Sequence, residues 1–189
     1  FVIMPKFSDA GDFSEKFAFV REKDSNQFGY INSKGDITIK PLFFEAGDFV
    51  EGFAKVKIGN YYGFIDAKGN IAVKPTFSKA SDFCEGFAVI ALPGKWGFID
   101  KTGKFVIAPK FDYASEFHWS FAPINIGGFW TNGRISGGKW GYIDKGGTMK
   151  IEAKFDKAYP FKNGIAKVIW KLEPAYINQN GDFIWQHFE

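Results

Sequence analysis

An internal repeat of about 34 residues constrains this sequence more than any other feature. The stretch GKWGFIDKTGK at residues 94–104 returns as GKWGYIDKGGT at residues 138–148. Its core is Gly, an aromatic residue, Ile and Asp or Asn, with a second Gly three residues later, and successive copies start 34, 34, 44 and 34 residues apart. The copies start at Gly29, Gly63, Gly97 and Gly141, and at Ala175, where Ala replaces the first Gly.

A second pattern recurs with the same period. PKFSDAGDF, which starts at Pro5, has related copies that start at Pro41, Pro75, Pro109 and, in degraded form, Ala153. Two independent markers that share one period identify a chain of five repeats. We expect one repeat domain over residues 1–189, with repeats at about 5–40, 41–74, 75–108, 109–152 and 153–189.

Each repeat has the sequence pattern of a β-meander. In the second repeat, residues 53–58 alternate as a strand does, and Gly59–Asn60 suits a tight hairpin turn. A second strand is expected at 61–66, and a third at 70–75 that ends at a proline, which cannot donate to a sheet. The sequence therefore predicts three antiparallel strands in each repeat.

Two connecting segments also recur. The Asp or Asn before the second turn stands three residues before a Gly, which predicts a side chain that closes the turn over its own backbone with Gly in the left-handed conformation. These acids and amides are at positions 32, 66, 100, 144 and 178. Between repeats, Asp82 and Glu85 have capping-box spacing and Gly86 follows, which predicts one turn of α- or 3₁₀-helix.

Both faces of the second strand are apolar. Trp96 and Phe98 share one face, and Gly97 and Ile99 share the other, so we expect Gly97 to leave a gap for a bulky side chain of an adjoining repeat. A meander of this size buries such surface only by stacking on its neighbours. The predicted fold is all-β, with five three-stranded repeats in an open, twisted, solenoid-like array. The alternative is a five-bladed β-propeller.

Composition excludes several classes of protein. The 189 residues include 24 Phe and 6 Trp, and the formal charge of +3 is spread along the chain without a basic run, so we expect no nucleic-acid partner. Cys84 is the only cysteine, which excludes an internal disulfide and a Cys-based zinc site. No apolar run approaches the roughly 18 residues of a membrane helix, so we expect no membrane insertion within this chain. Because the chain starts at Phe1, we expect an excised or processed start.

The two repeated stretches resemble the WG-repeat family of bacterial proteins, also called KWG repeats. GKWGFIDKTGK and GKWGYIDKGGT look like its signature, and the segment that follows each Pro is similar to the rest of its unit. This chain departs from the pattern at Phe28 and Tyr62, which replace Trp, and at Pro174–Ala175, which replaces Trp-Gly. The resemblance implies a bacterial repeat protein that binds a ligand, often in the cell envelope or secreted. It therefore implies an extracytoplasmic or cell-surface location, and it transfers no catalytic residues.

Two sets of residues at equivalent positions of the repeats, which we call columns, are candidates for a chemical site. Cys84 and His118 are 34 residues apart, and a thiol beside an imidazole is a nucleophile arrangement. The same column holds Ser14, Val50 and Lys162, which favours a tolerant surface position. Asp12, Asp48, Asp82 and Glu116 form an acidic column, but each stands where a cap or turn needs an acceptor. We therefore expect no enzyme activity, no metal and no cofactor.

The fourth repeat is ten residues longer than the others, and the excess lies within residues 123–138. Glycines flank an aromatic, an amide and a guanidinium group, which is typical of a mobile binding loop. The expected ligand-binding residues are Trp130, Asn132 and Arg134, flanked by Trp119. The alternative is a neutral insertion with Trp130 folded back onto the array.

The predicted function is that of a non-catalytic binding module for a carbohydrate, cell-wall or protein ligand. A solenoid of stacked repeats offers an extended surface for such a ligand, and the surplus of aromatic residues supplies stacking groups. The alternative function is structural, in which the array is a spacer or an oligomerisation module.

Overall fold

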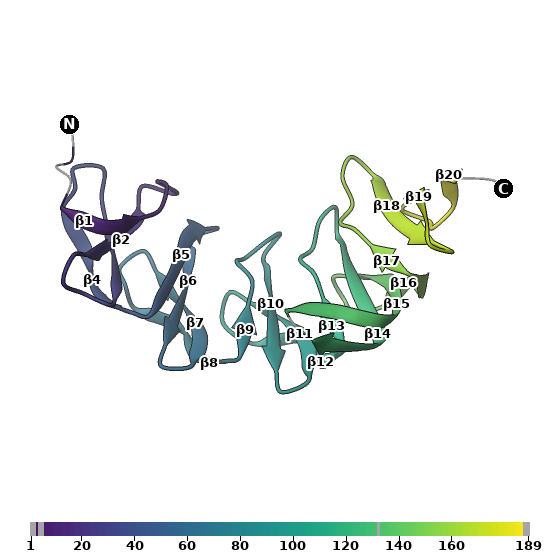
Figure 1. The fold of residues 1–189 in the computed structure, drawn as a ribbon, viewed down its shortest axis with the longest axis horizontal. Helices are drawn as coiled ribbons and strands as arrows, with labels where there is room; N and C mark the ends of the chain where they lie inside the picture. Colours follow the sequence, from purple (N-terminus) through teal and green to yellow (C-terminus); the bar gives the residue numbers. More distant parts are fainter. Residues whose placement is uncertain (1–2, 4–5, 132, 187–189) are drawn as a thin grey trace. The chain divides into compact units, whose positions relative to one another are not determined.

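The computed structural model describes residues 3, 6–131 and 133–186. Throughout these residues the chain forms β-strands joined by turns, and the strands make five antiparallel sheets of four strands each (Figure 1). None of the five sheets closes into a barrel. The prediction of an all-β chain of five antiparallel repeats is confirmed.

The bounds of the strands follow the repeat. The first sheet has the order β1 (Phe7–Ala10), β2 (Ala18–Glu22), β3 (Phe28–Ile31), β4 (Ile37–Phe43). The second has the order β5 (Glu45–Val50), β6 (Phe53–Ile58), β7 (Tyr61–Asp66), β8 (Ile71–Phe77). The third has the order β12 (Phe105–Phe111), β11 (Lys95–Asp100), β10 (Phe87–Leu92), β9 (Lys79–Ala80). The fourth has the order β13 (Tyr113–Ala114), β14 (Phe121–Thr131), β15 (Arg134–Asp144), β16 (Met149–Phe155). The fifth has the order β17 (Lys157–Ala158), β18 (Ile165–Trp170), β19 (Glu173–Asn178), β20 (Phe183–Gln186).

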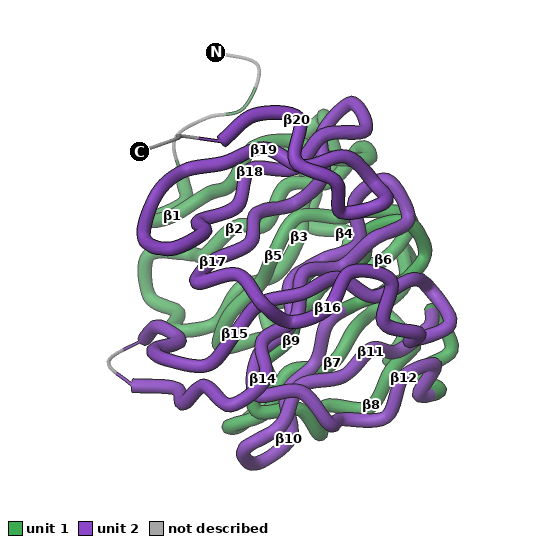
Figure 2. The backbone as a smooth tube through the Cα atoms, turned by 90° about the vertical axis from the view of Figure 1, so that its right-hand side faces the viewer, with its two compact units in different colours: residues 1–88, 101–104 green, residues 89–100, 105–189 purple. Residues whose placement is uncertain are grey.

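The chain divides into two compact units (Figure 2). Unit 1 comprises residues 1–88 and 101–104, and unit 2 comprises residues 89–100 and 105–189. The first two sheets belong to unit 1, and the fourth and fifth belong to unit 2, while the boundary runs through the third sheet within β10. The contacts described below lie within one unit or the other.

Each sheet has one strand more than the sequence predicts, because the segment between repeats is not helical. It forms the first strand of the next sheet and then a two-residue turn in which both residues have positive φ, as in Glu51 (53°) and Gly52 (89°). Val50 on one side of this turn pairs with Phe53 on the other. A turn with two positive φ values matches the twist of a β-hairpin. The predicted helical turn is therefore wrong, and Asp82 and Glu85 are hairpin residues rather than helix caps.

The second turn of each repeat has the predicted form. In the second repeat, the Oδ1 atom of Asp66 accepts hydrogen bonds from the backbone N–H groups of Lys68 and Asn70, both at 2.9 Å. Gly69, which follows three residues after Asp66, has a φ of 81°. The side chain closes the turn and the glycine takes the left-handed position, so this prediction is confirmed.

The glycine after the signature Trp is required by backbone, not by an adjoining side chain. A Cβ on Gly97 would lie 2.6 Å from the carbonyl oxygen of Ile107 and 2.7 Å from the nitrogen of Pro109, on the next strand of the same sheet. There β12 bulges, because the register shifts between the pairs Trp96–Phe111 and Phe98–Ile107. The expected gap for a neighbouring side chain is therefore filled from within the sheet. In the fifth repeat, where Ala175 replaces this glycine, the pairing with Gln186 is regular.

Aromatic rings join successive sheets. The aromatic residue of the signature in one repeat contacts the Phe of the hairpin segment in the next, and both rings are buried. The centroid distances are 5.0 Å for Tyr30–Phe49, 4.6 Å for Phe64–Phe83, 4.8 Å for Phe98–Phe117 and 4.9 Å for Tyr142–Phe161. We call each of these contacts a junction.

Where the signature residue is Tyr, its hydroxyl also crosses the junction. Tyr30 Oη donates to the carbonyl oxygen of Gly47 at 2.8 Å, and Tyr142 Oη donates to that of Tyr159 at 2.7 Å. Burial raises the pKa of both hydroxyls, so they remain protonated donors. At these two junctions a tyrosine hydroxyl thus adds a hydrogen bond to the ring packing.

The bulge predicts a strong effect of a small substitution. Gly97→Ala places a methyl group against the backbone of β12, and we expect it to lower the free energy of unfolding by about 3 kcal/mol. The matched control is Ala175→Gly, which removes a methyl group that the fifth sheet accepts and is expected to cost less than about 1 kcal/mol. Urea denaturation of the two variants measures the difference. Equal destabilisation by both would contradict this account of the glycine.

An aromatic surface on the fourth sheet

The ten additional residues of the fourth repeat lengthen a hairpin instead of forming a loop. Strands β14 and β15 contain eleven residues each, whereas the equivalent strands of the second sheet contain six. Their pairing runs from Phe121–Asp144 to Thr131–Arg134. The extra residues therefore form a paired hairpin and not the predicted loop, whereas their role in ligand binding stays a prediction.

A buried amide and four glycines bend this hairpin. Asn125 is fully buried, and its Nδ2 atom donates to the carbonyl oxygen of Gly137 at 3.2 Å. A Cβ on Gly128 or Gly138 would lie 2.2 or 2.5 Å from Asn125 Oδ1, so neither position accepts a larger residue. Gly127, Gly137 and Gly138 have positive φ values. The amide fills the space that the glycines leave, and the two features depend on each other.

The base of the hairpin carries a cluster of four aromatic rings, which we call the aromatic surface: Trp96, Tyr113, Trp130 and Trp140. Trp130 stacks on Tyr113 with centroids 5.4 Å apart and planes at 8°, and it also lies 5.7 Å from Trp96. Tyr113 contacts Trp96 at 4.7 Å and Trp140 at 5.6 Å. Trp130 remains 41% exposed. The indole is therefore folded back onto the sheet, yet it still presents surface to solvent.

An ion pair fixes the start of the hairpin next to this surface. Asp112 accepts from Lys95 Nζ at 2.6 Å through one oxygen and from the backbone N–H of Gly127 at 2.7 Å through the other. Burial alone opposes ionisation of Asp112, but these two donors outweigh it and hold the pKa of the carboxyl below its usual range. Asp112 is thus ionised at neutral pH and positions both the hairpin and the strand that carries Trp96.

The predicted site residues do not all lie together. Trp130 belongs to the aromatic surface, and Arg134 is exposed and pairs with Thr131 at the far end of the hairpin. Asn132 lies outside the described residues. Trp119 lies in the turn before β14, so most of the length of that strand, at about 3.3 Å per residue, separates it from Trp130. Trp119 and Trp130 thus belong to different ends of the strand, and a shared site for the two indoles stays a prediction.

The sequence does not predict the other three members of the aromatic surface. Trp96 and Trp140 belong to the repeated signature, which predicts core residues, and Tyr113 stands where the other repeats have Asp9, Glu45, Lys79 and Lys157. The replacement of a charged residue by Tyr113 at this one position is the feature of the sequence that could have indicated the aromatic surface. It marks the place where the first strand of the sheet meets the extended hairpin, since Tyr113 pairs with Asn125.

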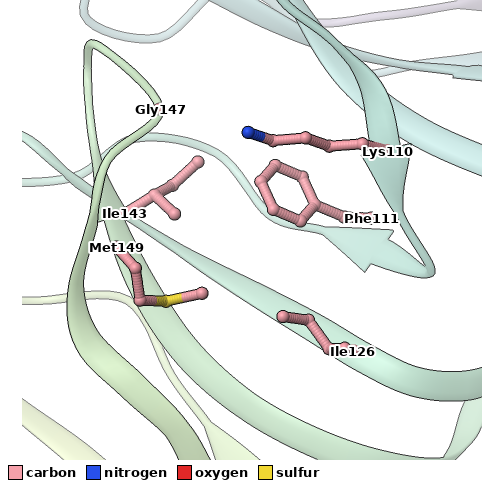
Figure 3. A pocket seen from close by; sticks show the side chains of 6 residues that line it. All are labelled: Lys110, Phe111, Ile126, Ile143, Gly147 and Met149. Carbon is pink, nitrogen blue, oxygen red and sulfur yellow. The ribbon is translucent and has the colours of Figure 1, made fainter.

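A pocket of about 410 Å³ is lined by residues of β12 in the third sheet and by residues of the fourth sheet (Figure 3). Its lining is apolar except for one lysine, and consists of Lys110, Phe111, Ile126, Ile143, Gly147 and Met149. The ammonium group of Lys110 lies 5.2 Å from the centroid of the Phe111 ring. Such a pocket suits an apolar group of a ligand with an acidic substituent, because the lysine is the one charged group among the lining residues.

The family profile of the WG containing repeat matches residues 1–25, 28–62, 62–96, 96–130 and 140–169. The chain belongs to the WG-repeat family. Residues 131–139 lie outside these matches, and residues 134–139 of this gap belong to β15. The gap between the two matches therefore falls within the lengthened part of the fourth repeat. No curated protein sequence matches the chain.

Solved structures with a similar fold have unrelated sequences. Hsv2 of Kluyveromyces lactis has a TM-score of 0.58 and 9% identity, over 93% of this chain and 63% of that protein. A eukaryotic initiation factor has a TM-score of 0.54 and 13% identity, over 95% of this chain and 56% of that one. The WG-repeat chain thus spans less than two thirds of either protein. These neighbours are β-propeller-like, the alternative architecture predicted from the sequence, and a four-stranded antiparallel sheet is the blade of that fold.

The other candidate residues of the WG-repeat chain are Cys84, His118 and the acidic column. Cys84 belongs to unit 1 and His118 to unit 2, where His118 Nε2 lies 3.8 Å from Glu116 Oε2. The described residues contain no group of three or more His, Cys, Asp or Glu side chains that could hold a metal ion. In the same part of the chain, no helix is long and apolar enough to cross a membrane.

Three acids of the predicted column interact in unit 1. Burial raises the pKa of Asp48, and the negative charges of Asp82 and Asp12 raise it further. Among the described residues, Asp48 Oδ1 is buried without a hydrogen-bond partner. Asp82 has a counter-ion, because its Oδ1 lies 3.3 Å from Lys55 Nζ. The column is therefore a source of repulsion that Lys55 only partly offsets.

This repulsion predicts a stabilising substitution. A raised folded-state pKa means that ionised Asp48 lowers stability at neutral pH, and the penalty fades as the pH falls below that pKa. We expect Asp48→Asn to raise the melting temperature at pH 7 by a few degrees and to have little effect near pH 3. Asp112→Asn is the control of opposite sign, because its lowered pKa stabilises the fold at pH 7. A lower melting temperature of Asp48→Asn at pH 7 would refute this interpretation.

Proposed function

We propose that this WG-repeat chain is a non-catalytic binding module that recognises a carbohydrate of the cell wall through the aromatic surface of its fourth sheet. The observation that carries the proposal is the geometry of Trp130, which is fixed by stacking on Tyr113 and still 41% exposed. A ring held in this way loses little conformational freedom when a ligand covers it. The propeller-like fold of the structural neighbours and the repeat architecture support a binding module in general.

The chemistry of the surface suits a sugar. The faces of aromatic rings carry partial negative charge, and the C–H groups on the apolar face of a pyranose lie well against them. Arg134, at the far end of the same hairpin, offers a planar set of donors for sugar hydroxyls or a carboxylate. A protein ligand with exposed aromatic or proline residues is the second candidate, because the same rings accept it. No cofactor or metal takes part in the proposed function.

We also propose where this module acts and that it has no enzyme activity. A module for cell-wall carbohydrate acts outside the cytoplasm or on the cell surface, which agrees with the implication of the family resemblance. We propose the absence of enzyme activity because the sequence offers one cysteine and two histidines, and the residues equivalent to Cys84 and His118 in the other repeats, which are Ser14, Val50 and Lys162, favour a tolerant surface position.

Binding to cell-wall glycans and peptidoglycan fragments tests the proposal. An array identifies the fragment, and calorimetry compares the wild type with variants. We expect Trp130→Ala to weaken binding about tenfold or more, because it removes the exposed stacking face. Arg134→Ala is expected to weaken it less, since the guanidinium group lies at the margin. Trp119→Ala is the matched control and should remain within threefold of the wild type, because this indole lies at the other end of β14.

These binding measurements distinguish the carbohydrate ligand from the protein ligand and test the position of the site. Affinity within threefold of the wild type for both Trp130→Ala and Arg134→Ala would place the site elsewhere. Binding to a protein but to no glycan would replace the carbohydrate by the second candidate.

The non-catalytic assignment has its own test. Cys84→Ser removes the one thiol of the chain, and we expect folding and glycan binding to be unchanged. The melting temperature and the dissociation constant measure these two properties. A loss of any measured activity by more than tenfold would restore the Cys–His hypothesis.

A further inference from the structure

The pocket that the third and fourth sheets line has a filled counterpart one repeat later, in the same compact unit. There Phe155 of the fourth sheet meets Trp170 and Phe183 of the fifth. The ring centroids lie 5.9 Å apart for Phe155 and Trp170, 6.2 Å for Phe155 and Phe183, and 6.0 Å for Trp170 and Phe183. We call these three residues the filled cluster.

Two smaller side chains leave the corresponding place open in the fourth repeat. Ile126 and Trp170 are each the sixth residue of their strands, β14 and β18. Met149 and Phe183 each begin the last strand of their sheets. The third ring is retained as Phe111, and Figure 3 shows it with Ile126 and Met149 around one common space. The pocket therefore lies where the next repeat holds two aromatic rings.

A lysine stands at both places. In the filled cluster, the ammonium group of Lys154 lies 5.5 Å from the ring centroid of Phe155 and 6.0 Å from that of Phe183. Lys110 is the equivalent lysine and approaches Phe111 in the same way, but a methionine takes the place of the second ring. An ammonium group is attracted to the face of an aromatic ring. The cation at the pocket can therefore receive a ring from a ligand.

The charge of Lys110 is not neutralised by the part of the chain that the structure describes. Lys110 is exposed and takes part in no ion pair there. The acid closest to it in the sequence is Asp112, and both oxygens of this carboxylate are engaged, one by Lys95 and one by the backbone N–H of Gly127. An apolar pocket with one such cation favours a ligand that combines an apolar body with a negative group.

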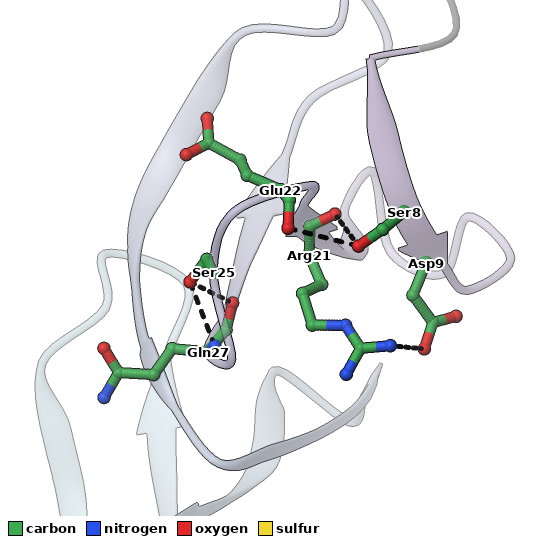
Figure 4. A network of polar contacts seen from close by, with 6 residues as sticks. All are labelled: Ser8, Asp9, Arg21, Glu22, Ser25 and Gln27. Atoms are coloured by element: carbon green, nitrogen blue, oxygen red, sulfur yellow. Dashed lines mark hydrogen bonds and ion pairs between the residues drawn. The ribbon is translucent and has the colours of Figure 1, made fainter.

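The residue at the position of Ile126 differs between repeats, so the fold does not dictate it. In the first repeat this position is Glu22, and polar contacts hold the strands there (Figure 4). Ser8 Oγ donates to the carbonyl oxygens of Arg21 and Glu22 at 3.1 Å each. Arg21 also pairs with Asp9 at 3.3 Å. The same position of the repeat is therefore compatible with a polar network, a filled cluster or an open pocket.

We propose that this pocket binds a small aryl carboxylate, a ligand that joins an aromatic ring to a carboxylate. The ring takes the place that Trp170 and Phe183 fill one repeat later. It lies against Phe111 and Met149, where contact between sulfur and a ring is favourable, and the carboxylate pairs with Lys110. The volume of about 410 Å³ is within the range of about 300–1,000 Å³ that is usual for ligand pockets. The pocket shares no residue with the aromatic surface, so this inference does not rest on the carbohydrate site.

Calorimetry of the whole chain with 2-naphthoate tests the proposal, because the bicyclic ring of this probe is close in size to an indole. We expect a dissociation constant of about 1 mM or lower, which a ligand of this size can reach. 2-Naphthamide has the same ring without the charge and should bind about fivefold more weakly. Octanoate has the carboxylate without a ring and should also bind about fivefold more weakly or less tightly still.

Two variants and a matched control locate the ligand. The double variant Ile126→Trp with Met149→Phe copies the filled cluster, so it should stay folded and weaken 2-naphthoate binding by about tenfold or more. Lys110→Met keeps the apolar part of the side chain and should abolish the preference for 2-naphthoate over 2-naphthamide. Lys154→Met is the control, at the equivalent lysine of the filled cluster, and should bind 2-naphthoate as the wild type does.

Four results would overturn the proposal. Absence of 2-naphthoate binding up to about 10 mM would do so, and equal affinity for octanoate would exclude recognition of a ring. Undiminished binding by the folded double variant would place the site elsewhere, and Met149→Phe alone decides this point if circular dichroism shows the double variant unfolded. A Lys110→Met variant that still prefers the carboxylate would exclude its pairing with Lys110. None of these results depends on glycan binding.

Discussion

The contact between a signature ring and the Phe of the following hairpin is the interaction on which the other features of the structure depend. A four-stranded sheet with two apolar faces has little stability alone, and it becomes stable when its faces are covered by neighbours. The ring of Tyr142 buries itself on Phe161 and also donates a hydrogen bond to the next sheet, so one residue provides both packing and register.

Backbone geometry makes this contact possible. The bulge opposite Gly97 brings β12 close to β11. The turn glycines let each turn lie against the sheet before it, as Gly69 does against Ile39. Both effects depend on the absence of a Cβ atom. At Gly97 the backbone of β12 occupies the place of that atom, and at the turn glycines the φ angle is positive. The repeated glycines of the signature are thus constraints of the sheet and its stacking, and they carry no information about a ligand.

The fourth repeat shows how a binding surface can be added to such a scaffold. Lengthening a hairpin costs little because most of the added residues that the structure describes pair across the ladder. The buried amide of Asn125 bends the extension so that Trp130 returns to Tyr113. The aromatic surface therefore combines Trp130 with three residues at ordinary positions of the repeat, namely Trp96, Tyr113 and Trp140. That combination separates this surface from the junctions, where the equivalent rings are fully covered.

The sequence by itself determined the number of repeats, their β-structure and the turn at each Asp or Asn, because these depend on local spacing and on the conformational range of glycine. It also located the insertion and Trp130. It did not determine the fourth strand of each sheet, because two consecutive positive φ values at Glu51 and Gly52 resemble a helix stop in sequence. Nor did it place Tyr113 beneath Trp130 or separate Trp119 from it. Those relations depend on which strands pair and how a hairpin bends, and only the tertiary structure decides them, because contacts between distant residues leave no local pattern.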